Sequence, residues 1–167
     1  MKLPIITYPH PTLSKAAELV KFPLCLKDRD LIKNMWQTVD EIGVGLAAPQ
    51  VDVSLQICII NMSKDMVKNK KQKLQFVIIN PKIVRQTGSC SMIEGCLSFP
   101  DEYFQIVRSS QVEVEYFDEN GKKNKLKADG WLGRVLLHEI DHLGGKLFIN
   151  EGGKKLKQED IEGQIID

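Results

Sequence analysis

The sequence carries little net charge and no long apolar run, and both absences narrow its class. Its 23 basic and 22 acidic residues leave a formal charge of +1, so no electrostatic attraction to nucleic acid or to an anionic membrane is expected. No apolar run is long enough to span a membrane, and the first residues lack the apolar core and cleavage site of a secretion signal. We therefore expect a cytoplasmic protein. The lysine-rich stretch 64–73 is interpreted as a solvated loop.

Cysteine and histidine are scarce, so their positions are informative. In a reducing compartment the four cysteines are expected to be thiols or metal ligands rather than disulfides. Cys25 and Cys58 lie in apolar contexts and are interpreted as small core residues. Of the three histidines, His10 lies between two prolines in a turn or extended segment, while His138 and His142 occur together in the motif HEIDH.

The HEIDH motif is expected to lie on a helix with a buried face. Apolar residues recur through 132–143 with helical spacing. Side chains four positions apart share a helix face, so His138 and His142 can bind one metal ion together. Glu139 would then lie beside the metal, where a proton-transferring group is needed. The alternative is a pair of core histidines with satisfied hydrogen bonds.

Two histidines leave a catalytic metal short of one protein ligand. The best candidate stretch is EGCLS at 94–98, because Cys96 follows a glycine that permits a tight turn and a thiolate binds borderline metals strongly. A buried, inert cysteine is the alternative. The stretch GVGLAAPQ at 43–50 contains two glycines that allow a ligand or strand to approach the backbone closely, and by itself it indicates only a turn.

An α+β fold accounts for the remaining periodicity. A helix is expected from Asp28, where acidic residues suit its start. Four runs have the composition or the alternation of strands: 55–60, 76–79, 111–116 and 122–128. Residues 83–85 are a candidate continuation of the second run. We expect antiparallel sheets packed around a central helix that carries the metal ligands, in one domain spanning 1–167.

Three motifs, GVGLAAPQ, EGCLS and HEIDH, resemble in order and spacing the signature motifs of the peptide deformylases, and the resemblance covers nearly the whole chain. It implies that Cys96, His138 and His142 bind one divalent metal ion. In that family the native ion is ferrous iron, and zinc, nickel or cobalt is often found in isolated protein.

The resemblance further implies the reaction and its partners. The substrates would be the N-formyl-methionyl ends of newly made polypeptides, and the products formate and a free amino terminus. Glu139 would act as general base and then as general acid, while the Gln50 amide and the backbone N–H of Leu97 would stabilise the oxyanion. Docking to the ribosome is consistent with such substrates, and the protein would be a monomer or a dimer.

Peptide contacts are also expected by resemblance. Gly43, Val44 and Gly45 would present an extended edge that pairs with the peptide as an added strand. An apolar pocket for the methionine side chain would be lined by Met92, Tyr103 and Val135. Glu94 would lie close to the metal ligands, where it either contacts the substrate or pairs with Arg108 to hold the cysteine loop.

Several positions depart from the family pattern. Gly133 and Leu137 replace the alanine and glutamine that commonly precede the first ligand histidine, and Gly133 is expected to loosen the helix by about 0.5 to 1 kcal/mol. Phe99 and Asp101 vary the entrance of the site, where peptide preference is set.

Two other functions would also account for part of these motifs. A zinc peptidase would share the helix motif, but its third ligand usually lies downstream, and Gln50 has no role in it. The second alternative is not an enzyme: a degenerate deformylase fold that only binds peptides, or a purely structural site, would not need Glu139 and Gln50.

Overall fold

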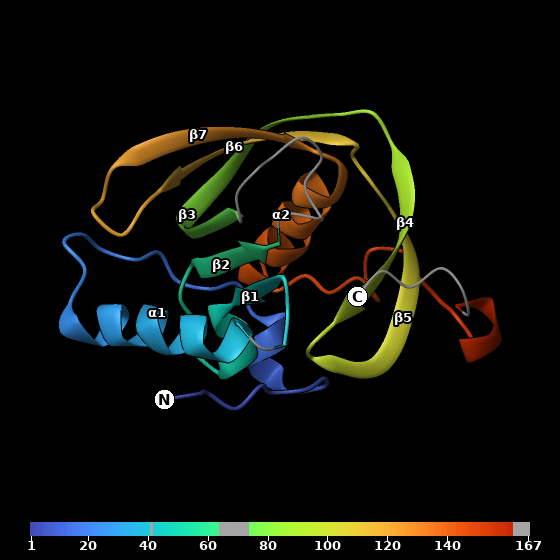
Figure 1. Cartoon of the computed structure of the whole chain (residues 1–167), viewed down its shortest axis with the longest axis horizontal. Coiled ribbons are helices and arrows are strands. Elements are labelled where there is room, and N and C mark those ends of the chain that lie inside the picture. The colour runs from blue at the N-terminus through green and yellow to red at the C-terminus, as the bar shows by residue number, and fades with distance from the viewer. Residues whose placement is uncertain (41, 64–73, 162–167) are drawn as a thin grey trace.

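The fold combines two α-helices with two antiparallel sheets (Figure 1). The computed structural model describes residues 1–40, 42–63 and 74–161. The helices are α1 (Leu26–Val39) and α2 (Gly130–Leu143). The strands are β1 (Gly45–Ala47), β2 (Ile57–Met62), β3 (Leu74–Thr87), β4 (Cys90–Cys96), β5 (Phe99–Arg108), β6 (Gln111–Phe117), β7 (Lys123–Asp129) and β8 (Lys154–Lys155). Short 3-10 helices are η1 (Pro11–Ser14), η2 (Ala48–Val51) and η4 (Gln158–Asp160).

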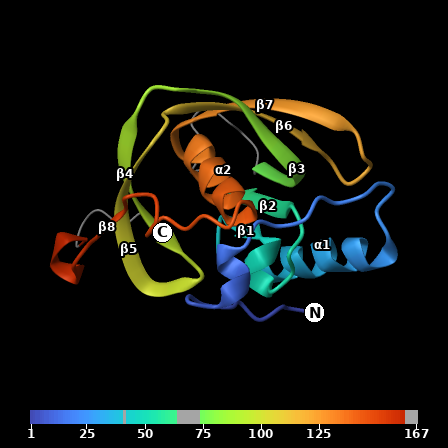
Figure 2. The ribbon, with the colours of Figure 1, turned by 180° about the vertical axis from the view of Figure 1, so that it is seen from behind.

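The two sheets enclose α2. One has five strands in the order β1-β2-β3-β6-β7, and the other has three in the order β4-β5-β8. Opposite views show α2 between the five-stranded sheet and the β4–β5 hairpin (Figures 1 and 2). The expected α+β fold with a central helix is therefore confirmed. No helix in the described part of the chain is long and apolar enough to cross a membrane.

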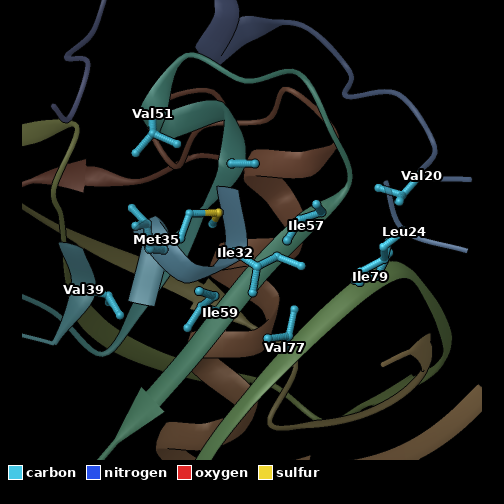
Figure 3. Packing of buried hydrophobic residues seen from close by; sticks show 12 residues of the cluster. Val20, Leu24, Ile32, Met35, Val39, Val51, Ile57, Ile59, Val77 and Ile79 are labelled. Carbon is cyan, nitrogen blue, oxygen red and sulfur yellow. The ribbon is translucent and has the colours of Figure 1, made fainter. Parts of the chain in front are cut away.

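Strand β2 explains why the five-stranded sheet can be covered on both faces. All six of its residues are buried, and successive side chains point to opposite faces. Ile57 and Ile59 pack with α1, whereas Cys58 and Ile60 pack with α2. Figure 3 shows Ile32 and Met35 of α1 within the cluster that contains Ile57 and Ile59. Two hydrophobic layers thus hold α2 on one side and α1 on the other.

The amino-terminal segment is bound to three parts of the domain through its main chain. The N–H of Ile6 donates to the carbonyl of Gln50 at 2.8 Å, and that of Tyr8 donates to Ser98 at 2.9 Å. Further along, the N–H of Ala17 donates to the carbonyl of Leu143 at the end of α2, at 2.8 Å. The segment therefore connects η2, the β4–β5 turn and α2.

Some expectations need correction. Cys25 is exposed at the start of α1 and is not a core residue, because the helix begins at Leu26 and turns its first residues to solvent; Cys58 is buried as expected. The strand predicted at 76–79 does continue through 83–85, and it extends further than expected, from Leu74 to Thr87; Asn80 has a φ of 48°, and the pairing with β6 shifts beyond Ile79. The solvated loop predicted at 64–73 lies outside the described residues.

The close packing of α2 against β7 explains why position 133 is a glycine, although it lies within a helix. A Cβ at this position would lie 3.3 Å from the carbonyl oxygen of Ala128 on β7. The glycine lets α2 approach the sheet closely, so the helix-propensity gain from alanine would be offset by a tight contact with backbone.

Candidate metal centre

Three potential ligand side chains from distant parts of the chain meet at the end of β4. Cys96 ends β4, while His138 and His142 lie one turn apart on α2. One ligand atom from each lies within 4.8 Å of the others, and Cys96 Sγ is 3.3 Å from His142 Nε2. A thiolate and two imidazoles form a donor set typical of a catalytic site for a borderline divalent metal.

An irregularity in the β4–β5 hairpin brings Cys96 to α2. Gly95 pairs with Tyr103, but the next residue, Cys96, pairs with Phe99, so residues 100–102 of β5 form a bulge. Bulges bend a strand and redirect its side chains. A Cβ at Gly95 would lie 3.1 Å from the Tyr103 ring, which explains the glycine before Cys96.

Glu94 orients the first histidine. Its Oε2 lies 2.9 Å from His138 Nδ1, so Nδ1–H donates a hydrogen bond to the carboxylate and Nε2 is left for a metal. Arg108 donates to both oxygens of Glu94, at 2.6 and 3.0 Å, and Arg134 donates to one at 3.1 Å. Burial favours the neutral acid, but hydrogen bonds from His138 and Arg108 outweigh it and lower the pKa of Glu94 to about 2.

The expected Glu94–Arg108 ion pair is thus present. Arg108 also binds Asp141 on α2, at 2.5 Å. Sequence reasoning missed Arg134, although it lies four positions before His138 on the same helix face. An arginine within an otherwise apolar helix face is a signal that a buried acid lies opposite it.

Glu139 is a buried carboxylate at the edge of the ligand cluster. Burial raises the pKa of Glu139 to about 7, although the nearby His138 lowers it in part. Its Oε2 has no hydrogen-bond partner among the described residues. A buried oxygen of this kind is costly unless a bound group donates to it. The carboxylate is therefore able to hold or release a proton near neutral pH.

The second histidine suits metal binding in its neutral form. Burial lowers the pKa of His142 well below its ordinary value, and the nearby His138 adds to this effect. A neutral imidazole keeps a lone pair for a metal. The chemistry of His142, His138 and Cys96 together therefore fits a divalent cation.

Gln50 places an amide group beside Cys96. Its Oε1 accepts a hydrogen bond from the N–H of Ala47 at 2.9 Å, which leaves the NH₂ group directed inward. Gln50 Nε2 lies 3.5 Å from Cys96 Sγ and 3.4 Å from Ser98 Oγ. Leu97, the other residue expected to stabilise an oxyanion, directly follows Cys96. Like Gln50, it lines the cavity described next.

A cavity of about 710 Å³ opens over these groups. One wall is formed by Gly43, Val44 and Gly45, and β1 is an edge strand of its sheet. The residues expected around an apolar side chain also line it: Met92, Tyr103 and Val135. The lining residues Trp131 and Met62, which extend the apolar wall, were not anticipated, because nothing in their local sequence separates them from core residues.

The chain matches one family model, described as polypeptide deformylase, over residues 2–158. The peptide deformylase of Wolinella succinogenes is 39% identical over 153 residues, which cover 89% of this chain and 87% of that protein. The structure of Ehrlichia chaffeensis peptide deformylase in complex with actinonin aligns with a TM-score of 0.82 and 37% identity, over 95% of this chain and 91% of that one. The Met-Ala-Ser-bound structure of the class I type b peptide deformylase of Acinetobacter baumannii aligns with a TM-score of 0.82 and 30% identity. The alignment covers 90% of this chain and 98% of that one.

Proposed function

The chain belongs to the peptide deformylase family, and on that premise we propose that its reaction takes place at Cys96, His138, His142 and Glu139. It is a metal-dependent hydrolase that removes the N-formyl group from the formyl-methionine of newly synthesised polypeptides and releases formate. The observation that carries the assignment to this site is the convergence of the thiol and two imidazoles beside a buried carboxylate. We also propose that residues 1–167 form one such catalytic domain.

The metal in the active protein is proposed to be Fe²⁺, held by Cys96, His138 and His142, with Zn²⁺, Ni²⁺ or Co²⁺ able to replace it in isolated protein. The mixed sulfur and nitrogen donors support a borderline divalent ion without selecting one. When bound, the cation supplies Lewis acidity, which acidifies water and polarises a carbonyl oxygen.

Glu139 is assigned the proton transfers. Its Oε2 takes a proton from the attacking water and later gives a proton to the departing amine, which would otherwise leave poorly. The raised pKa of Glu139, about 7 because of burial, supports this role, since both protonation states are accessible at neutral pH.

Gln50 and Leu97 are assigned to the formyl oxygen. The Gln50 NH₂ group and the Leu97 N–H would donate hydrogen bonds to it as negative charge develops during attack. Removing a donor of this kind typically costs about 2.7 to 4 kcal/mol of transition-state stabilisation. The hydrogen bond from Ala47 to the Gln50 carbonyl supports the assignment, because it fixes which end of the amide faces the cavity.

The peptide is proposed to lie along β1. Gly43, Val44 and Gly45 would pair with it as an added strand, and Met92, Tyr103 and Val135 would surround the methionine side chain. The Met-Ala-Ser bound to the A. baumannii relative supports a peptide in such a cavity.

Glu94 is assigned a positioning role through His138. Both of its oxygens are already engaged by protein side chains, which leaves little capacity for a substrate. Because the substrates are newly made polypeptides, we place the protein beside the ribosome in the cytoplasm, as a monomer or a dimer.

Formate release from formyl-Met-Ala-Ser tests the proposal, using protein purified without oxygen and analysed for metal. We expect the wild type to release formate and to leave internal peptide bonds intact, and Glu139→Ala to be at least a hundredfold slower while retaining metal. Cleavage of internal bonds in an unformylated peptide would favour the rival zinc peptidase. Undiminished formate release by Glu139→Ala would remove the assigned mechanism.

A further inference from the structure

The peptide edge at 43–45 depends on hydrogen bonds for its shape, because glycine supplies two of its three residues. Glycine has no side chain to pack, and its backbone has more conformational freedom than that of any other residue. Strand β1 is also an edge strand, and none of the described strands pairs with it on its outer side. An edge that receives a peptide on that side must therefore be held from its inner side.

Asn61 on β2 contacts the start of this edge twice. Its main-chain N–H donates to the carbonyl of Val44 at 2.7 Å, and its side-chain Nδ2 donates to the carbonyl of Gly43 at 3.3 Å. The N–H of Gly43 donates in turn to the carbonyl of Val39, the last residue of α1, at 3.1 Å. Both main-chain groups of Gly43 are thus bonded within the protein.

The pairing of Val44 with Asn61 also decides which groups of the edge face a peptide. Hydrogen-bonded residues alternate along an antiparallel strand. Val44 bonds to Asn61, and the next residue, Gly45, is the cross-strand partner of Ile60. The N–H and C=O of Gly45 therefore point away from β2, toward the free edge. The groups that a bound peptide can pair with directly follow the main chain that Asn61 holds.

The surroundings of the Asn61 side chain fix its orientation. It is 6% exposed and lies on the same face of β2 as Ile57 and Ile59, which pack with α1. Its Oδ1 accepts a hydrogen bond from Gln75 Nε2 at 2.8 Å, so the NH₂ end of the amide is directed at Gly43. Asn61 is not among the described residues that line the cavity, so it can act on a substrate only through the edge.

We propose that Asn61 is a positioning residue for peptide binding, which holds the main chain of Gly43 and Val44 in the conformation that pairs with the substrate. The proposal rests on the deformylase function and the peptide placement assigned above. Without the Asn61 amide, a bound peptide would have to order the edge at the expense of its own binding free energy. The loss should therefore appear in KM and not in the proton transfers assigned to Glu139.

The test uses Asn61→Leu, which has a side chain of similar size but no hydrogen-bond donor. With the Ni²⁺-loaded variant we expect KM for formyl-Met-Ala-Ser to rise by about 2- to 12-fold, as the net loss of one hydrogen bond predicts, and kcat to stay within about twofold. The Kd of the product Met-Ala-Ser, measured by calorimetry, should rise by the same factor. The inhibition constant of acetohydroxamate, which binds a metal but has no peptide, should stay the same.

Two further variants separate positioning from a general loss of stability. Asn61→Ser is too short to reach Gly43 but leaves a polar group in the buried position, so it should raise KM as Asn61→Leu does. Asn124→Leu is the matched control, because Asn124 Nδ2 donates to the carbonyl of Lys122 at 2.9 Å in the turn before β7, outside the described lining of the cavity. It should leave KM and the Kd of Met-Ala-Ser unaltered.

Each other result has a distinct meaning. Unchanged KM and Met-Ala-Ser affinity in a folded Asn61 variant would overturn the inference while leaving the deformylase assignment intact. A fall in kcat alone, an equal loss of acetohydroxamate binding or an equal rise of KM in Asn124→Leu would overturn it as well. Absence of formate release by metal-loaded wild type would overturn the proposed function and this inference with it.

Discussion

At the scale of single residues, Gly45 determines where the carboxylate of Glu139 can lie. A Cβ on Gly45 would lie 2.4 Å from Glu139 Oε1 and within 2.9 Å of two further atoms of that side chain. Because Glu139 is only 4% exposed, its side chain could move aside only by leaving its buried position for the cavity that it lines. The absence of a side chain at position 45 is therefore a requirement of the buried carboxylate as well as of the peptide edge.

Gly45→Ala is expected to lower kcat/KM for formyl-Met-Ala-Ser by about a hundredfold, because the displaced Glu139 would lose its proton-transfer geometry. Metal content and the far-UV circular dichroism spectrum should be unchanged. Gly144→Ala is a suitable control, since its Cβ would make only an ordinary 3.5 Å contact with the carbonyl of Asp141. Full activity in Gly45→Ala would show that Glu139 adjusts freely.

Cys58 is protected by burial, whereas Cys25 and Cys90 are exposed. Burial raises the pKa of the Cys58 thiol well above its ordinary value, and the charge of Glu139 adds to this. In the native protein iodoacetamide should modify Cys25 and Cys90 but not Cys58, as measured by peptide mass spectrometry. Labelling of Cys58 at the same rate in native and urea-unfolded protein would contradict this.

The raised pKa of the Cys58 thiol determines how its contribution to folding stability changes with pH. The folded state favours the neutral Cys58 thiol, so its contribution to stability is present below the ordinary thiol pKa of about 8.5 and is lost as the pH rises toward the folded value. Protection of Cys58 from iodoacetamide should therefore hold at neutral pH and below, and should weaken in alkaline solution.

At the scale of elements, α2 is more than a carrier of metal ligands, because it also buries Arg134. This side chain binds Glu94 and the carbonyls of Cys90 and Ile106, all on the β4–β5 hairpin. The helix and the hairpin are thus joined by polar contacts in addition to the ligand cluster.

Arg134→Met should destabilise the protein by about 3 kcal/mol. Removing one partner of a buried ion pair typically costs 3 to 5 kcal/mol, and the low end applies because Glu94 keeps Arg108 and His138. Urea unfolding would measure the change. Arg85→Met, at an exposed position on β3, should change stability by less than about 0.5 kcal/mol. A stability loss below 1 kcal/mol for Arg134→Met would mean that Arg108 alone holds Glu94.

Elements with regular periodicity could be predicted from the sequence, and irregular ones could not. The alternation in β6 reflects one buried face, and the apolar spacing in α2 reflects a helix buried against its neighbours, so both elements were located closely. The hairpin of β4 and β5 was not predicted, because the buried Glu94 and the bulge at 100–102 break the alternation.

The residues of the site also divide into those that a local pattern predicts and those that it does not. Local spacing alone predicted that His138 and His142 share a helix face. Residue type and the preceding glycine made Cys96 a candidate third ligand, with an inert cysteine as the alternative. The family resemblance decided between them and alone associated Gln50 with the site, since no local pattern encodes contacts across 46 residues or more. Arg134 was missed because its partners become visible only when β4 lies against α2.

At the scale of the whole molecule, the ligand cluster joins the two sheets across the centre. Cys96 belongs to the three-stranded sheet, whereas the histidines lie on the helix that packs against the five-stranded sheet. A metal bound by all three should therefore stabilise the complete fold, since ligands that bind only the folded state raise its stability.

Removal of metal by a chelator should abolish formate release and lower the melting temperature. At a free metal concentration of 100 times Kd the stabilisation is about 2.7 kcal/mol, which corresponds to a shift of roughly 5 to 10 °C for a chain of this length. Calorimetry of chelated protein with and without added Ni²⁺ would measure it. Cys96→Ala should show little shift on metal addition, and a full shift in that variant would place the ion elsewhere.

The main-chain hydrogen bonds of Ile6, Tyr8 and Ala17 have a practical consequence. They fasten the outermost part of the chain to the carbonyls of Gln50, Ser98 and Leu143, each within two residues of a group assigned to the chemistry. Changes that break these hydrogen bonds would therefore disturb turnover, even though no side chain of residues 1–17 lines the cavity, and trimming the segment would also remove Leu13 from the core.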